Sequence, residues 1–171
     1  MVLVDMGDGQ PVCVAEAQEE NAEKLLKWLH PLVEQLGIEV IVTDDLHSYP
    51  VAASQLELKR QVCRFHALRW MMLALKEVET TLGKDWQETI DEVRRILHHL
   101  PNNGPHLLHL LWKRIVPPPG PRTPELEALV RLRLLVLKLA ENWQQYALFL
   151  AEEGVPTTNN ATERSIGRWR T

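Results

Sequence analysis

The chain has 171 residues, of which 45% are hydrophobic and 25% are charged, as expected for one soluble domain with a real core. Its formal net charge of −4 argues against a dedicated nucleic-acid-binding domain, which usually has a basic excess, but still allows a local basic patch. No segment is apolar over a membrane-spanning length, and no signal-peptide pattern opens the chain, so we expect no membrane partner.

The first part of the chain predicts a hairpin followed by a helix. Two short apolar runs flank an Asp- and Gly-rich turn, which predicts a β-hairpin over residues 2–14. Residues 19–36 carry leucines and other apolar residues at helical spacing, with Gly37 at the expected C-cap. Pro31 lies inside this helix and should kink or break it, because proline has no N–H for the helical ladder.

The next segment predicts a parallel strand pair. The β-branched run 38–43 reads as a buried strand, and a short helix over 48–56 leads to a second strand over 59–64. Two strands joined through a helix by short connections form a βαβ unit, so we expect these strands to pair in parallel.

From Phe65 onward the hydrophobic pattern is helical, interrupted by two proline-rich connectors. The pattern predicts helices over residues 65–82, 85–100, 105–116 and 123–153. We expect residues 85–116 to form an inserted subdomain and the last, leucine-rich helix to lead back toward the strands.

Acidic residues that could bind a ligand follow the first buried strand. Asp44 and Asp45 come directly after the first buried strand, where α/β proteins often bind ligands, although either residue could simply cap the following turn. We favour Asp44 as the ligand and expect Asp45 to point outward or to cap the helix that begins near Leu46.

The two cysteines, Cys13 and Cys63, do not make a disulfide framework, so a reducing cytoplasm is the expected location.

Further candidate functional residues are a Cys-x-x-His pair, a polar turn before the last helix and three arginines. Cys63 and His66 have the spacing of half a zinc site, but the sequence offers no matching second pair. Asn160 and Glu163 have the spacing of a helix capping box, with Asn160 as the N-cap. The arginines beside the second strand either hold phosphates or are ordinary solvated charge; they are Arg60, Arg64 and Arg69.

Thr43-Asp44, then Cys63-x-x-His66, then Asn159-Asn160-x-x-Glu163-Arg164 resemble, in this order, the catalytic core of DDE transposases of bacterial insertion sequences. That family has a ribonuclease-H-like fold. The resemblance covers nearly the whole chain, but between His66 and Thr157 it extends only to helical character.

The resemblance implies metal-dependent DNA cleavage and strand transfer, as used in DNA transposition. It makes Asp44 and Glu163 catalytic ligands of Mg²⁺ or Mn²⁺, within a site that holds two ions in the intact family. The supporting residues that it implies are Cys63, His66, Asn159 and Asn160. It makes transposon ends, target DNA and further copies of the chain the expected partners. Arg164 and Arg168, on the last helix near these carboxylates, could hold DNA phosphates, although ordinary solvated charge is the favoured alternative for each of them.

The expected fold is α/β, mostly helical, with a partial ribonuclease-H-like sheet and a large helical insertion. Residues 1–66 would form the core, 67–155 the helical insertion with its return helix, and 156–171 the start of the helix that carries Glu163. Only two strands precede the first helix, where the family has three. We therefore expect a fragment that lacks the first strand and its catalytic aspartate, and Asp5 lies too close to the hairpin turn to replace it.

Two other interpretations stay open. The chain could be an inactive, degenerate transposase remnant that keeps the fold without the catalysis. It could also be a helical interaction domain in which the acidic residues merely cap turns, and this interpretation predicts that Asp44 and Glu163 lie far apart in space.

Overall fold

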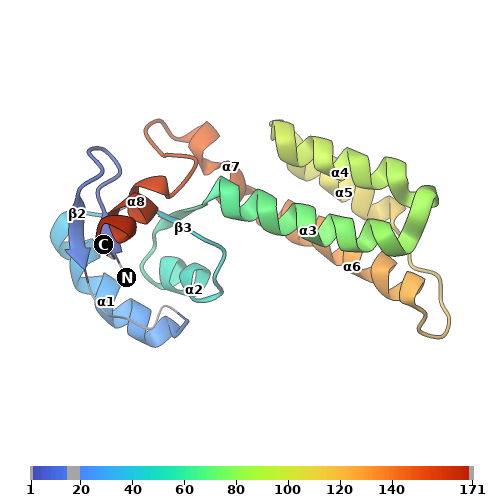
Figure 1. Cartoon of the computed structure of the whole chain (residues 1–171), viewed down its shortest axis with the longest axis horizontal. Helices are drawn as coiled ribbons and strands as arrows, with labels where there is room; N and C mark the ends of the chain where they lie inside the picture. The colour runs from blue at the N-terminus through green and yellow to red at the C-terminus, as the bar shows by residue number, and fades with distance from the viewer. Residues whose placement is uncertain (1, 15–19, 170–171) are drawn as a thin grey trace. The chain divides into compact units, whose positions relative to one another are not determined.

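The computed structural model describes residues 2–14 and 20–169, apart from the side chains of Val2, Ser165, Arg168 and Trp169. Over these residues the chain is a mostly helical α/β protein (Figure 1). The elements run in the order β1 (Val2–Val4), β2 (Pro11–Val14), α1 (Ala22–Leu36), β3 (Val40–Thr43), α2 (Ser48–Gln55), β4 (Lys59–Val62), α3 (Arg64–Leu82), the 3-10 helix η1 (Gly83–Trp86), α4 (Gln87–His99), α5 (Gly104–Arg114), α6 (Pro124–Glu141), α7 (Trp143–Ala151) and α8 (Asn160–Trp169). None of the helices described is both long and apolar enough to cross a membrane.

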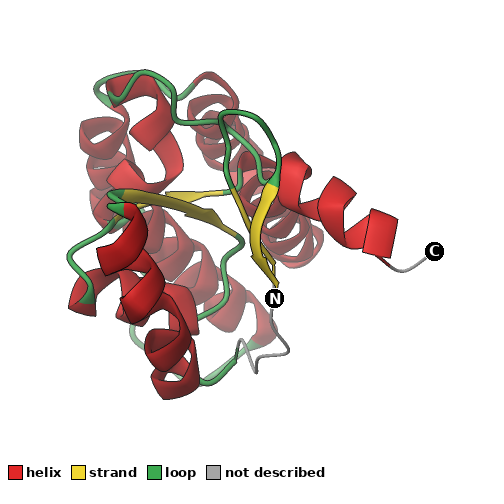
Figure 2. Cartoon of the chain, turned by 90° about the vertical axis from the view of Figure 1, so that its left-hand side faces the viewer, coloured by secondary structure: helices red, strands yellow, loops and turns green. Residues whose placement is uncertain are grey.

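The strands form two separate sheets of two strands each within the described chain (Figure 2). Strands β1 and β2 pair antiparallel, which confirms the predicted hairpin. Strands β3 and β4 pair in parallel, with Val40 opposite Lys59 and Thr43 opposite Val62, which confirms the predicted βαβ unit.

Helix α1 ends at the predicted C-cap, because Gly37 closes it at a φ of 63°. It begins later than predicted, at Ala22, where the Asn21 side chain accepts a hydrogen bond from the Lys24 amide at 3.1 Å, an N-cap that the sequence prediction did not include. The helix continues through Pro31, so the expected break does not occur; a proline removes only one backbone hydrogen bond, which the rest of the helix tolerates here. The predicted start at Glu19 lies outside the described residues.

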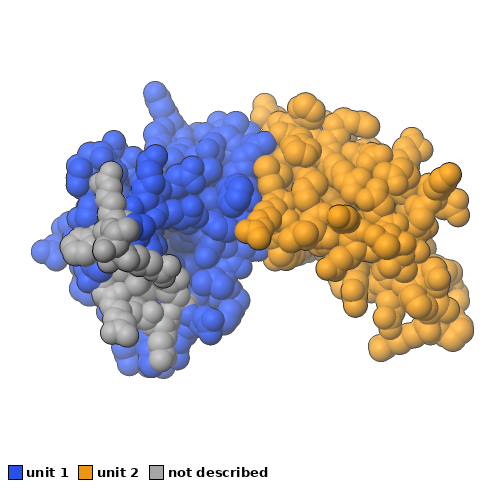
Figure 3. Space-filling model, in the orientation of Figure 1, with its two compact units in different colours: residues 1–67, 144–171 blue, residues 68–143 orange. Residues whose placement is uncertain are grey.

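The described chain divides into two compact units (Figure 3). The first comprises residues 1–67 and 144–171, and the second comprises residues 68–143. In the first unit, α1 packs on α2 through Leu25, Leu29 and Ala52. The elements of the second unit are all helices, with α5 packed on α6. Its fully buried side chains include Met71, Leu75, Ile90, Val93, Leu108, Leu111, Ile115, Leu132, Val136 and Leu139.

The single helix predicted over residues 123–153 is wrong, because two helices, α6 and α7, cover this stretch. They separate at Asn142, whose backbone amide and side-chain amide both donate to the Lys138 carbonyl, at 3.0 and 2.8 Å. The backbone bond is the last one of α6, and Asn142 itself leaves the helical conformation, with φ −103° and ψ 16°. The break also coincides with the boundary between the two units, which lies between Trp143 and Gln144.

We predict that Gly104→Ala destabilises the helical unit. A Cβ at this position would lie 2.2 Å from the ring of Trp143, which is itself only 8% exposed. Overpacking of this kind costs about 1–3 kcal/mol, to be measured as a lower midpoint of urea unfolding. Gly120→Ala is the matched control, because the space around Gly120 is open; equal midpoints for the two variants would contradict the prediction.

Candidate functional site

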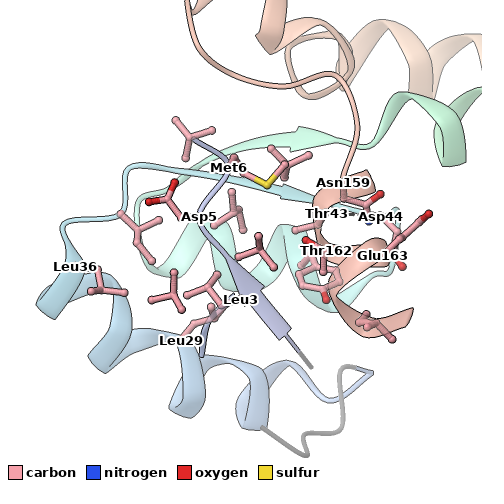
Figure 4. A pocket seen from close by; sticks show the side chains of 18 of the residues that line it. Leu3, Asp5, Met6, Leu29, Leu36, Thr43, Asp44, Asn159, Thr162 and Glu163 are labelled. Atoms are coloured by element: carbon pink, nitrogen blue, oxygen red, sulfur yellow. Dashed lines mark hydrogen bonds between the residues drawn. The ribbon is translucent and has the colours of Figure 1, made fainter. Parts of the chain in front are cut away.

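The first unit contains a pocket of about 620 Å³ (Figure 4). The hairpin, α1, β3 and α8 all contribute to its lining, and most of the lining side chains are apolar. One end is polar, where Thr43, Asp44, Asn159, Thr162 and Glu163 come together, while Asp5 and Met6 lie away from this end. This polar end is the candidate functional site.

Asp44 follows β3 directly and lines the pocket. The guanidinium of Arg60 fixes the backbone at this point, because its Nη2 donates to the Asp44 carbonyl at 2.7 Å and its Nε donates to Thr43 Oγ1 at 2.9 Å. The Asp44 carboxylate accepts a longer hydrogen bond, of 3.4 Å, from the Leu46 amide. Asp44 is therefore held at the pocket by its backbone, while its carboxylate accepts a single hydrogen bond, the long one from Leu46, within the described part of the chain.

Asp45 has a different role from its neighbour. Its carboxylate lies 3.6 Å from Nη2 of Arg60, whose side chain is only 3% exposed. Burial lowers the pKa of Arg60, and the charge of Asp45 acts in the opposite direction. Burial likewise raises the pKa of Tyr146, and the nearby Asp45 adds to that rise. The expectation that Asp45 points outward or caps the following helix is wrong, because it faces a buried cation, and it is Asp44 that accepts from Leu46.

Polar side chains of β4 bind the strand to α7. Nη1 of Arg60 donates to Gln145 Oε1 at 2.8 Å. Gln61 is fully buried, and its side chain accepts from the Phe149 amide at 3.0 Å. Lys59 adds an ion pair with Glu152, which lies just after the end of α7. Three consecutive residues of one strand thus secure a helix and the residue that follows it, both far away in the sequence.

This attachment continues into the polar turn before α8. The Arg64 amide donates to the Thr157 carbonyl at 2.8 Å, just where β4 gives way to α3. Helix α8 then begins at Asn160, and Glu163 faces the site, with its Oε1 3.6 Å from Nε2 of His66. Two segments from distant parts of the sequence therefore meet at the pocket.

The predicted capping box is not formed. Asn160 is the first helical residue rather than the N-cap, and it is exposed. Asn159 takes the position before the helix, where its carbonyl accepts from the Glu163 amide at 3.2 Å. Its side-chain Oδ1 is buried and has no partner among the described residues. The Glu163 side chain does not cap the helix and lies beside His66.

Cys63 and His66 connect the strands to this arrangement. Cys63 is fully buried, and its amide donates to the Thr43 carbonyl at 2.6 Å, next to Asp44. His66 is half-buried and has a buried Nδ1 without a hydrogen-bond partner in the described chain. Among the residues that the structure describes, no three His, Cys, Asp or Glu side chains are grouped so that they could hold a metal ion.

The remaining predicted residues have simpler surroundings. Arg164 is exposed on α8, and the side chain of Arg168 lies outside the described residues. Asp5 lines the pocket, but its Oδ1 accepts from the Gly7 amide at 2.7 Å and is thereby tied to the hairpin turn. The guanidinium of Arg64 lies 5.8 Å from the centre of the Phe149 ring, so this arginine is partly engaged inside the unit.

The sequence interpretation missed Arg60 and Gln61. It treated Arg60 as a phosphate contact or a solvated charge, whereas Arg60 is buried and organises the backbone around Asp44. One signal was available: both residues lie in a strand paired with a buried one, and a charge in such a place needs internal partners.

No known protein-family model matches the chain, and neither the curated proteins nor the solved structures contain a significant match.

We predict that Asp45→Asn and Asp44→Asn have unequal effects on stability. Removing the Asp45 charge leaves buried Arg60 without its carboxylate partner and should lower the free energy of unfolding by about 1–2 kcal/mol. Asp44→Asn should change it by less than about 0.5 kcal/mol, since Arg60 bonds the Asp44 carbonyl and not its side chain. Urea unfolding at neutral pH measures both, and a larger loss for Asp44→Asn would contradict the assignment.

Proposed function

We propose that the chain is the catalytic-core part of a DDE transposase, whose parent activity is metal-dependent DNA cleavage and strand transfer. The observation that carries the proposal is that Asp44, at the end of β3, and Glu163, on α8, line one pocket although they are distant in sequence. These are the two acidic residues on which the resemblance depends. The Cys-x-x-His pair of the resemblance also contributes, since Nε2 of His66 lies 3.6 Å from Oε1 of Glu163.

We also propose that the first unit is a partial ribonuclease-H-like core. The hairpin followed by a helix, the parallel pair β3–β4 and the final helix α8 support this, because they follow the family's order apart from its first strand. The described strands form two separate sheets, not the single partial sheet expected from the sequence. The parallel pair delivers Asp44 at its C-terminal end, the position at which α/β sheets carry their ligand residues.

The donor atoms of the polar end suit a hard divalent cation. Asp44 and Glu163 supply carboxylate oxygens, and Asn159 has a buried amide oxygen without a partner in the described chain. Mg²⁺ and Mn²⁺ prefer such oxygen ligands. A bound ion would offset the repulsion between the two carboxylates and stabilise charge on a phosphate undergoing displacement.

DNA is the partner that this chemistry needs. Exposed Arg164 follows Glu163 on α8 and is suited to a phosphate contact close to the carboxylates. Under this proposal the protein works in the cytoplasm on transposon ends and target DNA, as one of several copies.

An inactive remnant is the second candidate, and one observation favours it. Asp5, which could otherwise stand in for the missing aspartate, is tied to the hairpin turn, where its Oδ1 accepts from the Gly7 amide. The interpretation as a helical interaction domain predicts distant acidic residues, and the shared pocket argues against it. We therefore expect this chain to bind metal weakly and to lack strand transfer on its own.

Titration with Mn²⁺, followed by loss of the free-ion electron paramagnetic resonance signal, tests the site. We predict weak binding that Asp44→Asn and Glu163→Gln each reduce by at least about tenfold, which corresponds to ~1.4 kcal/mol. Glu153→Gln is the matched control, because Glu153 is exposed and does not line the pocket. Equal affinity in all three variants would show that the two residues do not hold the ion.

A cleavage and strand-transfer assay with Mg²⁺ or Mn²⁺ separates the two candidates. We predict no strand transfer by this chain, because two carboxylates hold a catalytic ion less firmly than the family's three. Robust activity that disappears in Asp44→Ala would show that the chain is complete for catalysis, with Asp5 or Asp45 as the first candidates for the third ligand.

A further inference from the structure

The pocket meets two strands at their edges. Its lining includes Leu3 and Val4 of β1 with the two residues that follow them, Val12 of β2, and the consecutive residues 40–44 at β3 and just after it. Successive side chains of a strand point to opposite faces of its sheet. A cavity above one face would therefore touch mainly every second residue, whereas a cavity beside the backbone edge touches all of them. The unbroken run of lining residues thus indicates that the pocket reaches the edge of β3, and the pair Leu3 and Val4 indicates the same for β1.

The hydrogen bonds of β3 show which backbone groups face the pocket. The carbonyls of Glu39 and Thr43 accept from the amides of Lys59 and Cys63, at 2.9 and 2.6 Å. Backbone groups of alternate residues point to opposite edges of a strand, so Ile41 also faces β4. Val40 and Val42 consequently direct their amides and carbonyls away from β4, toward the edge that borders the pocket.

The same reasoning applies to β1. The Asp5 amide donates to the Gln10 carbonyl and the Asp5 carbonyl accepts from the Gly9 amide, both at 2.9 Å, so Asp5 faces the hairpin partner. The register shifts between Leu3 and Val4, and Val4 lies opposite Pro11, which has no N–H to donate to it. Val4 therefore directs its backbone groups to the other edge. Within the described chain, each of the two sheets ends at its second strand, so the edges of β1 and β3 lack a strand partner.

The walls on either side of these edges suit apolar side chains. Helix α1 contributes Trp28, Leu29 and Leu36 to the lining, and α8, which packs against β1, contributes Ile166 (Figure 4). A segment lying between the edges would therefore have apolar cover. Unpaired strand edges beside an apolar cavity are the features that bind an added strand.

We propose that the pocket is a slot for one extended apolar peptide segment, which inserts between β1 and β3 and joins the two small sheets into one. The occupant is an extended backbone because only such a group supplies amides and carbonyls to both edges at once. A small apolar molecule would leave the backbone groups of Val4, Val40 and Val42 without partners. This inference does not depend on the metal chemistry proposed above.

Amide hydrogen exchange of the full-length, ¹⁵N-labelled chain tests the proposal. The probe is the peptide Lys-Lys-Val-Ile-Val-Thr-Val-Lys, whose terminal lysines keep it soluble. Added in excess, it should slow exchange of the Val40 and Val42 amides by at least about tenfold, because they gain a partner. The amides of Ile41 and Thr43 should change less, since they already face β4. This alternation is specific to strand insertion.

The matched control is the same peptide with proline in place of its first and third valines, which removes two backbone donors. It should give no alternating protection, because proline cannot complete the ladder. Uniform protection of residues 40–43 by the probe, equal effects of the two peptides, or the absence of binding would each overturn the proposal. So would tight binding of an apolar dye that the probe peptide fails to displace, since the pocket would then be a small-molecule site.

Discussion

The buried guanidinium of Arg60 is the constraint on which the first unit depends. A charge in this position needs internal partners, and it finds them in Thr43, the Asp44 carbonyl, Asp45 and Gln145. The first three fix the chain at the end of β3, and the fourth belongs to α7. One side chain therefore sets the position of Asp44 and also holds the returning helix that leads to α8.

The pocket combines two features of different chemistry. At its polar end, Asp44, Glu163 and Asn159 gather oxygen atoms that suit a divalent cation, and His66 lies close to Glu163. Along its length, the unpaired edges of β1 and β3 offer backbone hydrogen bonds between apolar walls. The proximity of the two features means that a strand inserted in the slot would end close to the carboxylates.

Local patterns predicted most of the elements, because capping, periodicity and β-branched runs act over a few residues. The hairpin, the βαβ unit and the Gly37 cap of α1 are cases in which the pattern and the structure agree. The errors concern the ends of helices. The expected long helix ends at Asn142, whose side chain bonds the Lys138 carbonyl, and Glu163 faces His66 and does not form the expected capping box.

The sequence by itself determined the order and type of most elements. It also indicated Asp44 and Glu163 as the two acidic residues expected to share a site. Only the tertiary structure decided that both line one pocket, that Asp45 serves Arg60, and that β1 and β3 present open edges to the same cavity. The physical reason is that these outcomes depend on contacts between residues far apart in the chain, above all those of Arg60 and Gln61 with α7. No local spacing encodes such contacts, because burial and partner choice are settled only when the segments pack together.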